Sequence, residues 1–328
     1  MAFCLNICVQ VLIKSFKKNP MKIKLLVITL FVSLSLWSQD QTENSKELSI
    51  TEWIDGTLLT PKEMTNATPL AIIIAGSGPT NRDGNQNFLM NNSLKKLAEG
   101  LFEHGIATFR YDKRIVKQIR KNKVDSNIMF DDFVFDATAV IDYFRNEGQF
   151  SKIYVIGHSQ GSLVGMLACK GKVDGFISLA GAGHSIDTVI IDQIAKTAPM
   201  YTEDSKRIFS ELRQNKTTTD YPPALSTIFD ISIQPFMSNW MKYNPQEVIK
   251  DLDIPILIIN GTKDLQVSVE EANRLKAASV KSEIHIIENM NHILFTIEGD
   301  DLENSKSYNE GYRDINEQAL QYLVEFIN

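Results

Sequence analysis

Cysteine is scarce in this chain of 328 residues, which has only three. Two of them, Cys4 and Cys8, precede an expected processing site, so Cys169 alone would remain and no internal disulfide framework is expected. An excess of cationic residues is also lacking, because 34 Lys and Arg stand against 40 Asp and Glu, and the net charge of −6 argues against a nucleic-acid partner, which requires a basic face. We find no low-complexity tract. With 43% apolar residues, the chain can form a hydrophobic core that needs no metal ion or disulfide to stabilise it.

The chain also lacks an apolar run of the roughly 20 residues that a transmembrane helix requires. Residues 25–37 form a shorter run, which two lysines precede and Ser38 closes, and this pattern is typical of a secretory signal peptide. We therefore expect residues 1–38 to be a targeting segment and the processed protein to be exported to the periplasm or the extracellular space, without stable membrane insertion. An uncleaved anchor is the alternative. Residues 1–20, which precede Met21, result either from a start codon assigned too far upstream or from a long basic n-region of the signal peptide.

Short apolar runs alternate with helical stretches from about residue 48 to residue 328. Asp55 and Gly56 form a turn motif that predicts a hairpin between the first two strands. Helical spacing is found at residues 88–104, 130–145 and 312–327. The expected strands lie at residues 48–52, 57–60, 70–75, 106–111, 153–156, 176–179, 256–259 and 284–287. This alternation predicts an α/β fold with a doubly wound, mostly parallel sheet, which binds ligands beyond the carboxyl ends of its strands.

The interval between residues 179 and 256 contains no strand pattern. Its helical segments lie at about 189–196, 205–214 and 233–243. A structureless loop of this length is uncommon in a compact domain, so we interpret residues 183–252 as a helical cap insertion over the ligand site.

The most specific motif is G-H-S-Q-G at residues 157–161, which directly follows an expected strand and precedes a helix. This is the G-x-S-x-G nucleophile elbow in its structural context. Side chains in place of the two glycines would clash with the strand and the helix. The turn therefore exposes the oxygen of Ser159 at a helix N-terminus, where developing negative charge is favoured.

A serine nucleophile requires a base and an acid that orients the base. Among five histidines, His292 lies just beyond the last strand, where a loop can bring it over Ser159. Asp264 follows the strand at 256–259 and precedes His292 by 28 positions. The chain order Ser, Asp, His is the order expected for the α/β-hydrolase arrangement, and we predict these three residues as the catalytic triad.

Two backbone N–H groups should form the oxyanion hole. Gln160, which follows the nucleophile, would supply one, and Ser77, in the glycine-rich loop after the strand at 70–75, would supply the other. Phe236 and Trp240 recur at helical spacing in the cap and are candidates to line an apolar acyl pocket. The alternative is that they only pack the cap onto the core.

These motifs resemble the α/β-hydrolase superfamily, and more narrowly a bacterial carboxylesterase-like branch of serine hydrolases. The resemblance depends on residues 76–84, 157–161, 260–267 and 290–292. It implies hydrolysis of a small-molecule ester through an acyl-enzyme, with no metal and no organic cofactor. The motif Y-D-K-R at residues 111–114 departs from the branch because Ile115 replaces a glycine, and we interpret Asp112 and Arg114 as structural.

Three alternatives to an esterase remain on the same fold. A serine aminopeptidase-like peptidase would need an acidic group to hold a free amine. A thioesterase fits export less well, because acyl-CoA is cytosolic. A non-catalytic binding protein usually lacks one member of the triad.

Overall fold

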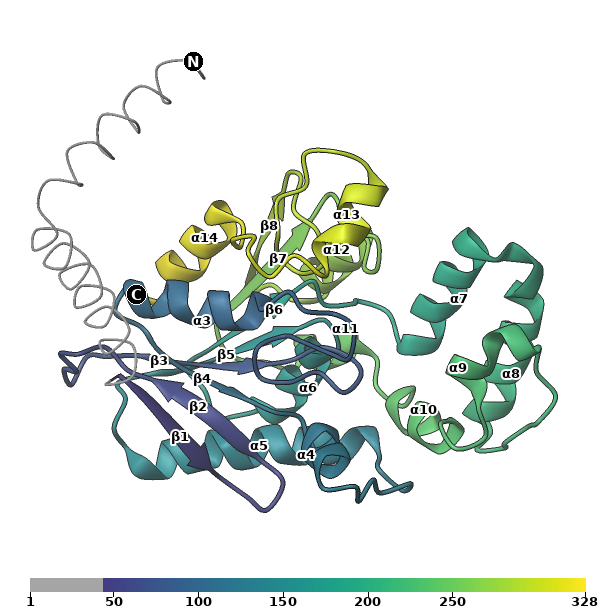
Figure 1. The fold of residues 1–328 in the computed structure, drawn as a ribbon, viewed down its shortest axis with the longest axis horizontal. Coiled ribbons are helices and arrows are strands. Elements are labelled where there is room, and N and C mark those ends of the chain that lie inside the picture. Colours follow the sequence, from purple (N-terminus) through teal and green to yellow (C-terminus); the bar gives the residue numbers. More distant parts are fainter. Residues whose placement is uncertain (1–43) are drawn as a thin grey trace, which may run out of the picture. The chain divides into compact units, whose positions relative to one another are not determined.

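The computed structural model of the protein describes residues 44–328, and the predicted targeting segment 1–38 lies outside these residues. Eight strands form one sheet in the order β1-β2-β4-β3-β5-β6-β7-β8 (Figure 1). The strands are β1 (Ser45–Ser49), β2 (Asp55–Leu59), β3 (Leu70–Ile74), β4 (Ala107–Tyr111), β5 (Ile153–His158), β6 (Gly175–Leu179), β7 (Ile256–Gly261) and β8 (Ser282–Ile287).

All strands from β4 to β8 along the sheet run parallel, whereas β2 pairs with β4 in the antiparallel direction. This confirms the predicted α/β fold with a mostly parallel sheet. Every residue of β3, β5 and β7 is buried, as is usual for parallel strands that helices cover on both faces. Because the parallel strands point the same way, the loops that follow β3, β5, β7 and β8 emerge at one edge of the sheet.

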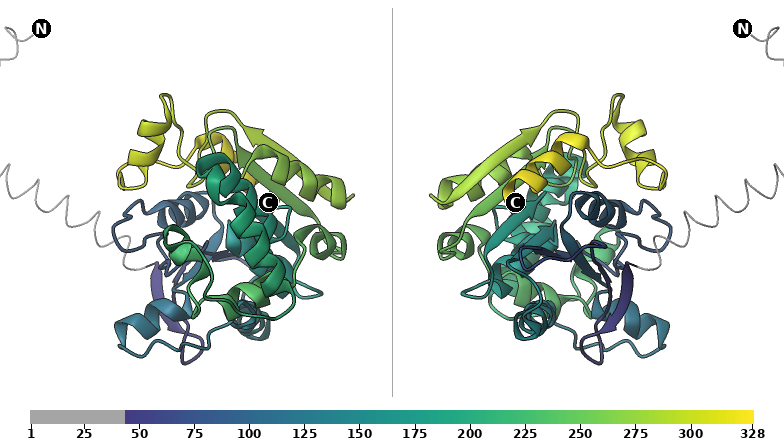
Figure 2. Two further views of the ribbon diagram at one scale, coloured as in Figure 1. Left: turned by 90° about the vertical axis from the view of Figure 1, so that its right-hand side faces the viewer. Right: turned by 90° about the vertical axis from the view of Figure 1, so that its left-hand side faces the viewer.

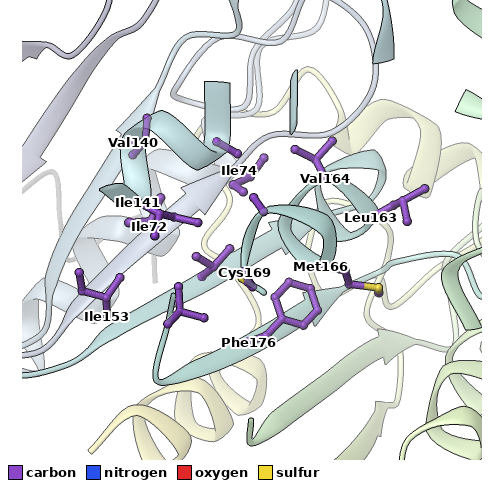
Figure 3. Close-up of a cluster of buried hydrophobic side chains, with 14 of the residues drawn as sticks. Ile72, Ile74, Val140, Ile141, Ile153, Leu163, Val164, Met166, Cys169 and Phe176 are labelled. Carbon is purple, nitrogen blue, oxygen red and sulfur yellow. The ribbon is translucent and has the colours of Figure 1, made fainter. Parts of the chain in front are cut away.

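Helices cover both faces of the sheet, and side chains alternate between two hydrophobic clusters. Ile72 and Ile74 of β3 pack with α5 (Phe130–Glu147) and α6 (Gln160–Ala168), as Figure 3 shows. The intervening Ala71 and Ile73 pack on the opposite side, with α3 (Ser93–Glu103) and α14 (Glu317–Ile327). The helix α12 (Val269–Ala278) contributes Ala272 and Leu275 to the first cluster.

Four α-helices between β6 and β7 form a group set apart from the sheet (Figures 1 and 2). They have a hydrophobic cluster of their own, which includes Ile208, Phe209 and Phe229. The elements of this group are α7 (Ile186–Thr197), η1 (Pro199–Tyr201), α8 (Thr202–Arg213), η2 (Pro223–Leu225), α9 (Ser226–Phe229) and α10 (Gln234–Trp240). The next helix, α11 (Pro245–Lys250), instead packs on α6 and α12, and its Ile249 belongs to the core beside the sheet.

The predicted hairpin turn at Asp55 and Gly56 is wrong, because both residues belong to β2. The chain turns at residues 50–54 instead, where the N–H of Ile50 donates to the carbonyl of Ile54 at 2.9 Å. Gly56 is required by a neighbour on β4: a Cβ at this position would lie 2.3 Å from the ring of Phe109. The structure also has helices that the sequence did not predict, among them α4 (Arg114–Arg120), α12 and α13 (Asp301–Ser307).

Candidate active site

Ser159 stands between β5 and α6 with a backbone conformation that non-glycine residues rarely adopt, at φ 54° and ψ −121°. Such a conformation costs about 1–3 kcal/mol and persists only where the surroundings enforce it. Here the packing of strand against helix enforces it. A Cβ on Gly157 would lie 2.3 Å from the carbonyl oxygen of Gly161, and a Cβ on Gly161 would lie 2.4 Å from that of Ile74. The two glycines of the motif therefore have the steric role that the sequence indicated.

His292 and Asp264 are joined by a hydrogen bond of 2.8 Å between Nδ1 of the imidazole and Oδ2 of the carboxylate. The Asp264 side chain is fully buried, and that of His292 is 5% exposed. Oδ1 of Asp264 accepts the backbone N–H groups of Gln266 and Val267, each at 2.8 Å, so the carboxylate has one fixed orientation. Because the carboxylate accepts the Nδ1 proton, Nε2 of His292 is left as the basic nitrogen.

The loop that carries His292 is held by its neighbour, Asn291, which is fully buried. Oδ1 of Asn291 accepts the backbone N–H groups of Ile293 and Phe295, at 3.2 and 2.9 Å. Its Nδ2 donates to Asn304 and Ser307 of α13 at 3.0 and 2.9 Å. Asn291 is not among the residues predicted from the sequence, although its position directly before His292 is the feature that marks it.

The glycine-rich loop after β3 lies next to the elbow, since a Cβ on Gly76 would lie 3.2 Å from the Cβ of Ser159. The end of β4 holds this loop in place. Asp112 accepts the backbone N–H of Arg82 at 2.8 Å and pairs with its guanidinium at 3.1 Å. Arg114 pairs with two carboxylates of α5. Through these contacts, Asp112 holds the loop after β3 and Arg114 holds α5.

Ser159 and His292 line one pocket with a volume of about 300 Å³. Ser77 lines it as well, whereas the Gln160 side chain lines a separate small cavity behind the elbow. The walls come from the loop after β3, the start of α3 and the loops after β7 and β8. The full lining is Gly76, Ser77, Gly78, Thr80, Gly84, Gln86, Leu89, Asn91, Ser93, Leu94, His158, Ser159, Gln266, His292, Ile293 and Tyr308.

Phe236 and Trp240 do not line this pocket. Trp240 stacks on Phe130 of α5 with ring centroids 5.4 Å apart and planes 6° apart, and Phe236 meets the ring of Phe133 edge-on at 5.8 Å. Both partly buried rings thus pack against side chains of α5. These contacts fit the alternative, in which the two side chains pack the cap onto the core, and their role in binding an acyl group stays a prediction.

No group of three or more potential metal ligands occurs among residues 44–328. None of the helices in the same range has the length and apolarity that a membrane span requires.

The sequence profile of the hydrolase family described as serine aminopeptidase, S33 matches residues 91–300, well over half of the chain. The chain belongs to this family. The matched range contains Ser159, Asp264 and His292. The predicted membership of the α/β-hydrolase superfamily is thereby confirmed, and the protein is a hydrolase.

The hydrolase is also similar to Esterase EstD of Thermotoga maritima, with 26% identity over 272 residues. The alignment covers 78% of this chain and 62% of the relative, so the chain spans less than two thirds of that protein's length. Among solved structures, Est1E from Butyrivibrio proteoclasticus matches with a TM-score of 0.55 and 18% identity, over 87% of this chain and 99% of that one. The Pyrococcus furiosus esterase PF2001 matches with a TM-score of 0.52 and 15% identity, over 88% and 94%. These two likenesses establish the α/β-hydrolase fold.

Proposed function

We propose that this hydrolase is a serine carboxylesterase that cleaves small to medium acyl esters through an acyl-enzyme formed on Ser159. The observation that carries the proposal is the bond between His292 and Asp264 beside the strained elbow, because it presents a basic nitrogen at the pocket that contains the serine. The esterase names of the relatives support the choice of substrate.

In the proposed mechanism, Nε2 of His292 takes the proton of Ser159 as the serine oxygen attacks the ester carbonyl. The N–H groups of Ser77 and Gln160 bind the negative oxygen of the tetrahedral intermediate. Asp264 stabilises the imidazolium, which then protonates the departing alcohol. Water attacks the acyl-enzyme by the same route and releases the acid.

The size and chemistry of the pocket support a small, uncharged substrate. Its volume of about 300 Å³ is at the lower end of the range of ligand sites, which favours short acyl groups. Its lining is made of apolar, hydroxyl and amide side chains beside His158 and His292, and the described residues place no Asp or Glu in it.

A serine aminopeptidase is the second candidate, because the family is described by that activity. An aminopeptidase has to hold the free amine of its substrate, and an acidic side chain is the usual partner for an amine. The lining contributed by residues 44–328 contains no such carboxylate, which favours the esterase.

The test compares p-nitrophenyl acetate, butyrate and octanoate with aminoacyl p-nitroanilides, for the wild type and for Ser159→Ala. We expect turnover of the short esters and a loss of up to roughly 10⁶ in kcat in the variant. Ester turnover that survives in Ser159→Ala would remove Ser159 from the mechanism. Faster cleavage of the anilides than of the esters would favour the aminopeptidase.

We also propose that the protein is exported, on the pattern of residues 1–38. Cleavage after Ser38 would give a processed chain that begins at Gln39. Mass spectrometry of the protein purified from the periplasm or the medium tests this, and a chain that retains residues 25–37 would contradict it.

A further inference from the structure

Lys113 is a buried cation that lies directly behind the active site. It follows Asp112 at the end of β4, and its side chain reaches toward the elbow. Nζ donates to the backbone carbonyl of Gly76 at 2.9 Å and to Oε1 of Gln160 at 2.8 Å. It also lies 4.2 Å from the centre of the Phe133 ring. All of these partners are acceptors or an aromatic face.

A lysine is rarely buried without a carboxylate partner, because removal of its charge from water is costly. Lys113 forms no ion pair with any described residue, and burial lowers its pKa to about 7. Asp136 lines the same small cavity, but this carboxylate already pairs with Arg114 at 2.7 Å. If Lys113 served only to fill space, an apolar side chain would do so at lower cost. The burial of a lysine at this position therefore points to a role beyond packing.

The two acceptors of Lys113 belong to the two segments that would form the oxyanion hole. The carbonyl of Gly76 and the N–H of Ser77 are parts of one planar peptide unit and point in opposite directions. A hydrogen bond to that carbonyl therefore fixes the direction of the N–H and polarises it toward better donation. The second bond attaches the same nitrogen to Gln160, the other proposed donor residue.

We propose that Lys113 is a positioning residue for the oxyanion hole, which ties the Gly76–Ser77 peptide to Gln160 and holds both N–H donors toward one point. The inference rests on the proposed function, since it assumes that an oxyanion forms at Ser159. Lys113 does not line the pocket of Ser159 and acts through the two backbone groups.

The experiment measures ester kinetics and the affinity of a trifluoromethyl ketone for the wild type, Lys113→Met and Lys117→Met. The ketone forms a tetrahedral adduct with the nucleophile and places its oxygen in the hole. Methionine keeps the length of the lysine side chain and removes the two bonds. Lys117 lies in α4, the helix that begins directly after Lys113, but it pairs with Asp55 at 2.7 Å, so Lys117→Met is the matched control.

For Lys113→Met we expect kcat to fall at least 10-fold, KM to change less than 3-fold and ketone affinity to fall by the same factor as kcat/KM. We expect its Tm to stay within a few degrees of the wild type, because the cost of the buried charge disappears with the bonds. Lys117→Met should keep wild-type kinetics. A folded Lys113→Met protein with kcat within 2-fold of the wild type would overturn the proposal, as would lower activity with unchanged ketone affinity.

If Lys113→Met does not fold, Gln160→Met tests the same link, because it keeps the backbone N–H and removes one acceptor of Lys113. We then expect a smaller loss of kcat with KM unchanged, and wild-type kcat would overturn the proposal. Failure of the proposed function has a different result: the wild type would neither hydrolyse the esters nor bind the ketone, or Ser159→Ala would do both as well as the wild type.

Discussion

His158 donates its Nε2–H to the backbone carbonyl of His292 across 2.8 Å. The bond has this direction because a carbonyl oxygen only accepts. The centroids of the two imidazole rings lie 4.9 Å apart. His158 is the elbow residue directly before Ser159. The loop of the proposed base is thus attached directly to the turn of the proposed nucleophile.

His158→Phe should lower activity by misplacing His292. Phenylalanine retains an aromatic ring and removes the donor, which leaves the buried carbonyl without its partner at a cost of about 1–3 kcal/mol. We expect kcat to fall roughly 10-fold with KM nearly unchanged, because the change affects the relative positions of base and nucleophile. His285→Phe is the control, since His285 lies on β8 and stacks on Tyr322 of α14. Wild-type kcat in His158→Phe would contradict the attachment.

The stability of the hydrolase should fall in mild acid because of His158. Burial, reinforced by the nearby His292, lowers the pKa of His158 to about 4 from its ordinary 6.5. Between these values the unfolded chain binds a proton that the folded protein does not bind, so the free energy of unfolding rises with pH across this window. The free energy of unfolding, measured with denaturant at pH 4, 5, 6 and 7, should rise less steeply with pH in His158→Phe than in the wild type. Equal slopes in both proteins would mean that His158 titrates normally.

Asp264→Asn should leave the fold intact and remove most of the activity. An amide oxygen can still accept the N–H groups of Gln266 and Val267. The other end of the amide would meet Nδ1 of His292 as a donor and favour the wrong imidazole tautomer. We expect kcat on p-nitrophenyl butyrate to fall by roughly 10³–10⁴ with a nearly unchanged Tm. A loss of less than 10-fold would exclude Asp264 as the orienting acid.

Trp240→Ala and Tyr308→Phe should separate packing from substrate binding. Loss of the stacked ring at Trp240 should destabilise the protein by roughly 3 kcal/mol while KM for short esters changes less than 2-fold. Tyr308 lines the pocket, and its hydroxyl accepts from Gln266 at 2.7 Å, so Tyr308→Phe should change KM with little effect on Tm. Thermal melts and ester kinetics measure both quantities. A raised KM in Trp240→Ala would instead indicate that this cap helix, α10, takes part in substrate binding.

The sequence indicated the sheet and the proposed catalytic residues because these have strong local patterns. The buried strand β3 is a continuous apolar run, β5 and β7 begin with such runs, and Ser159 lies in a motif whose glycines cannot be replaced without a steric clash. The hairpin turn was predicted at the wrong place because Gly56 leaves room for the ring of Phe109 on β4. Local propensity contains no information about that contact between two strands.

The amino-acid sequence by itself determined the periodicity, the strand–turn–helix context of Ser159 and the order of Ser159, Asp264 and His292 along the chain. Only the tertiary structure decided which side chains support them. The contacts of Lys113 with Gly76 and Gln160 span 37 and 47 positions, and that of His158 with His292 spans 134. Such pairs leave no local pattern, because they exist only once parallel strands bring their carboxyl ends to one edge of the sheet. Trp240 is a further example. Its helical spacing is compatible with lining a pocket or with packing in a core, and its contact with α5 is visible only in the tertiary structure.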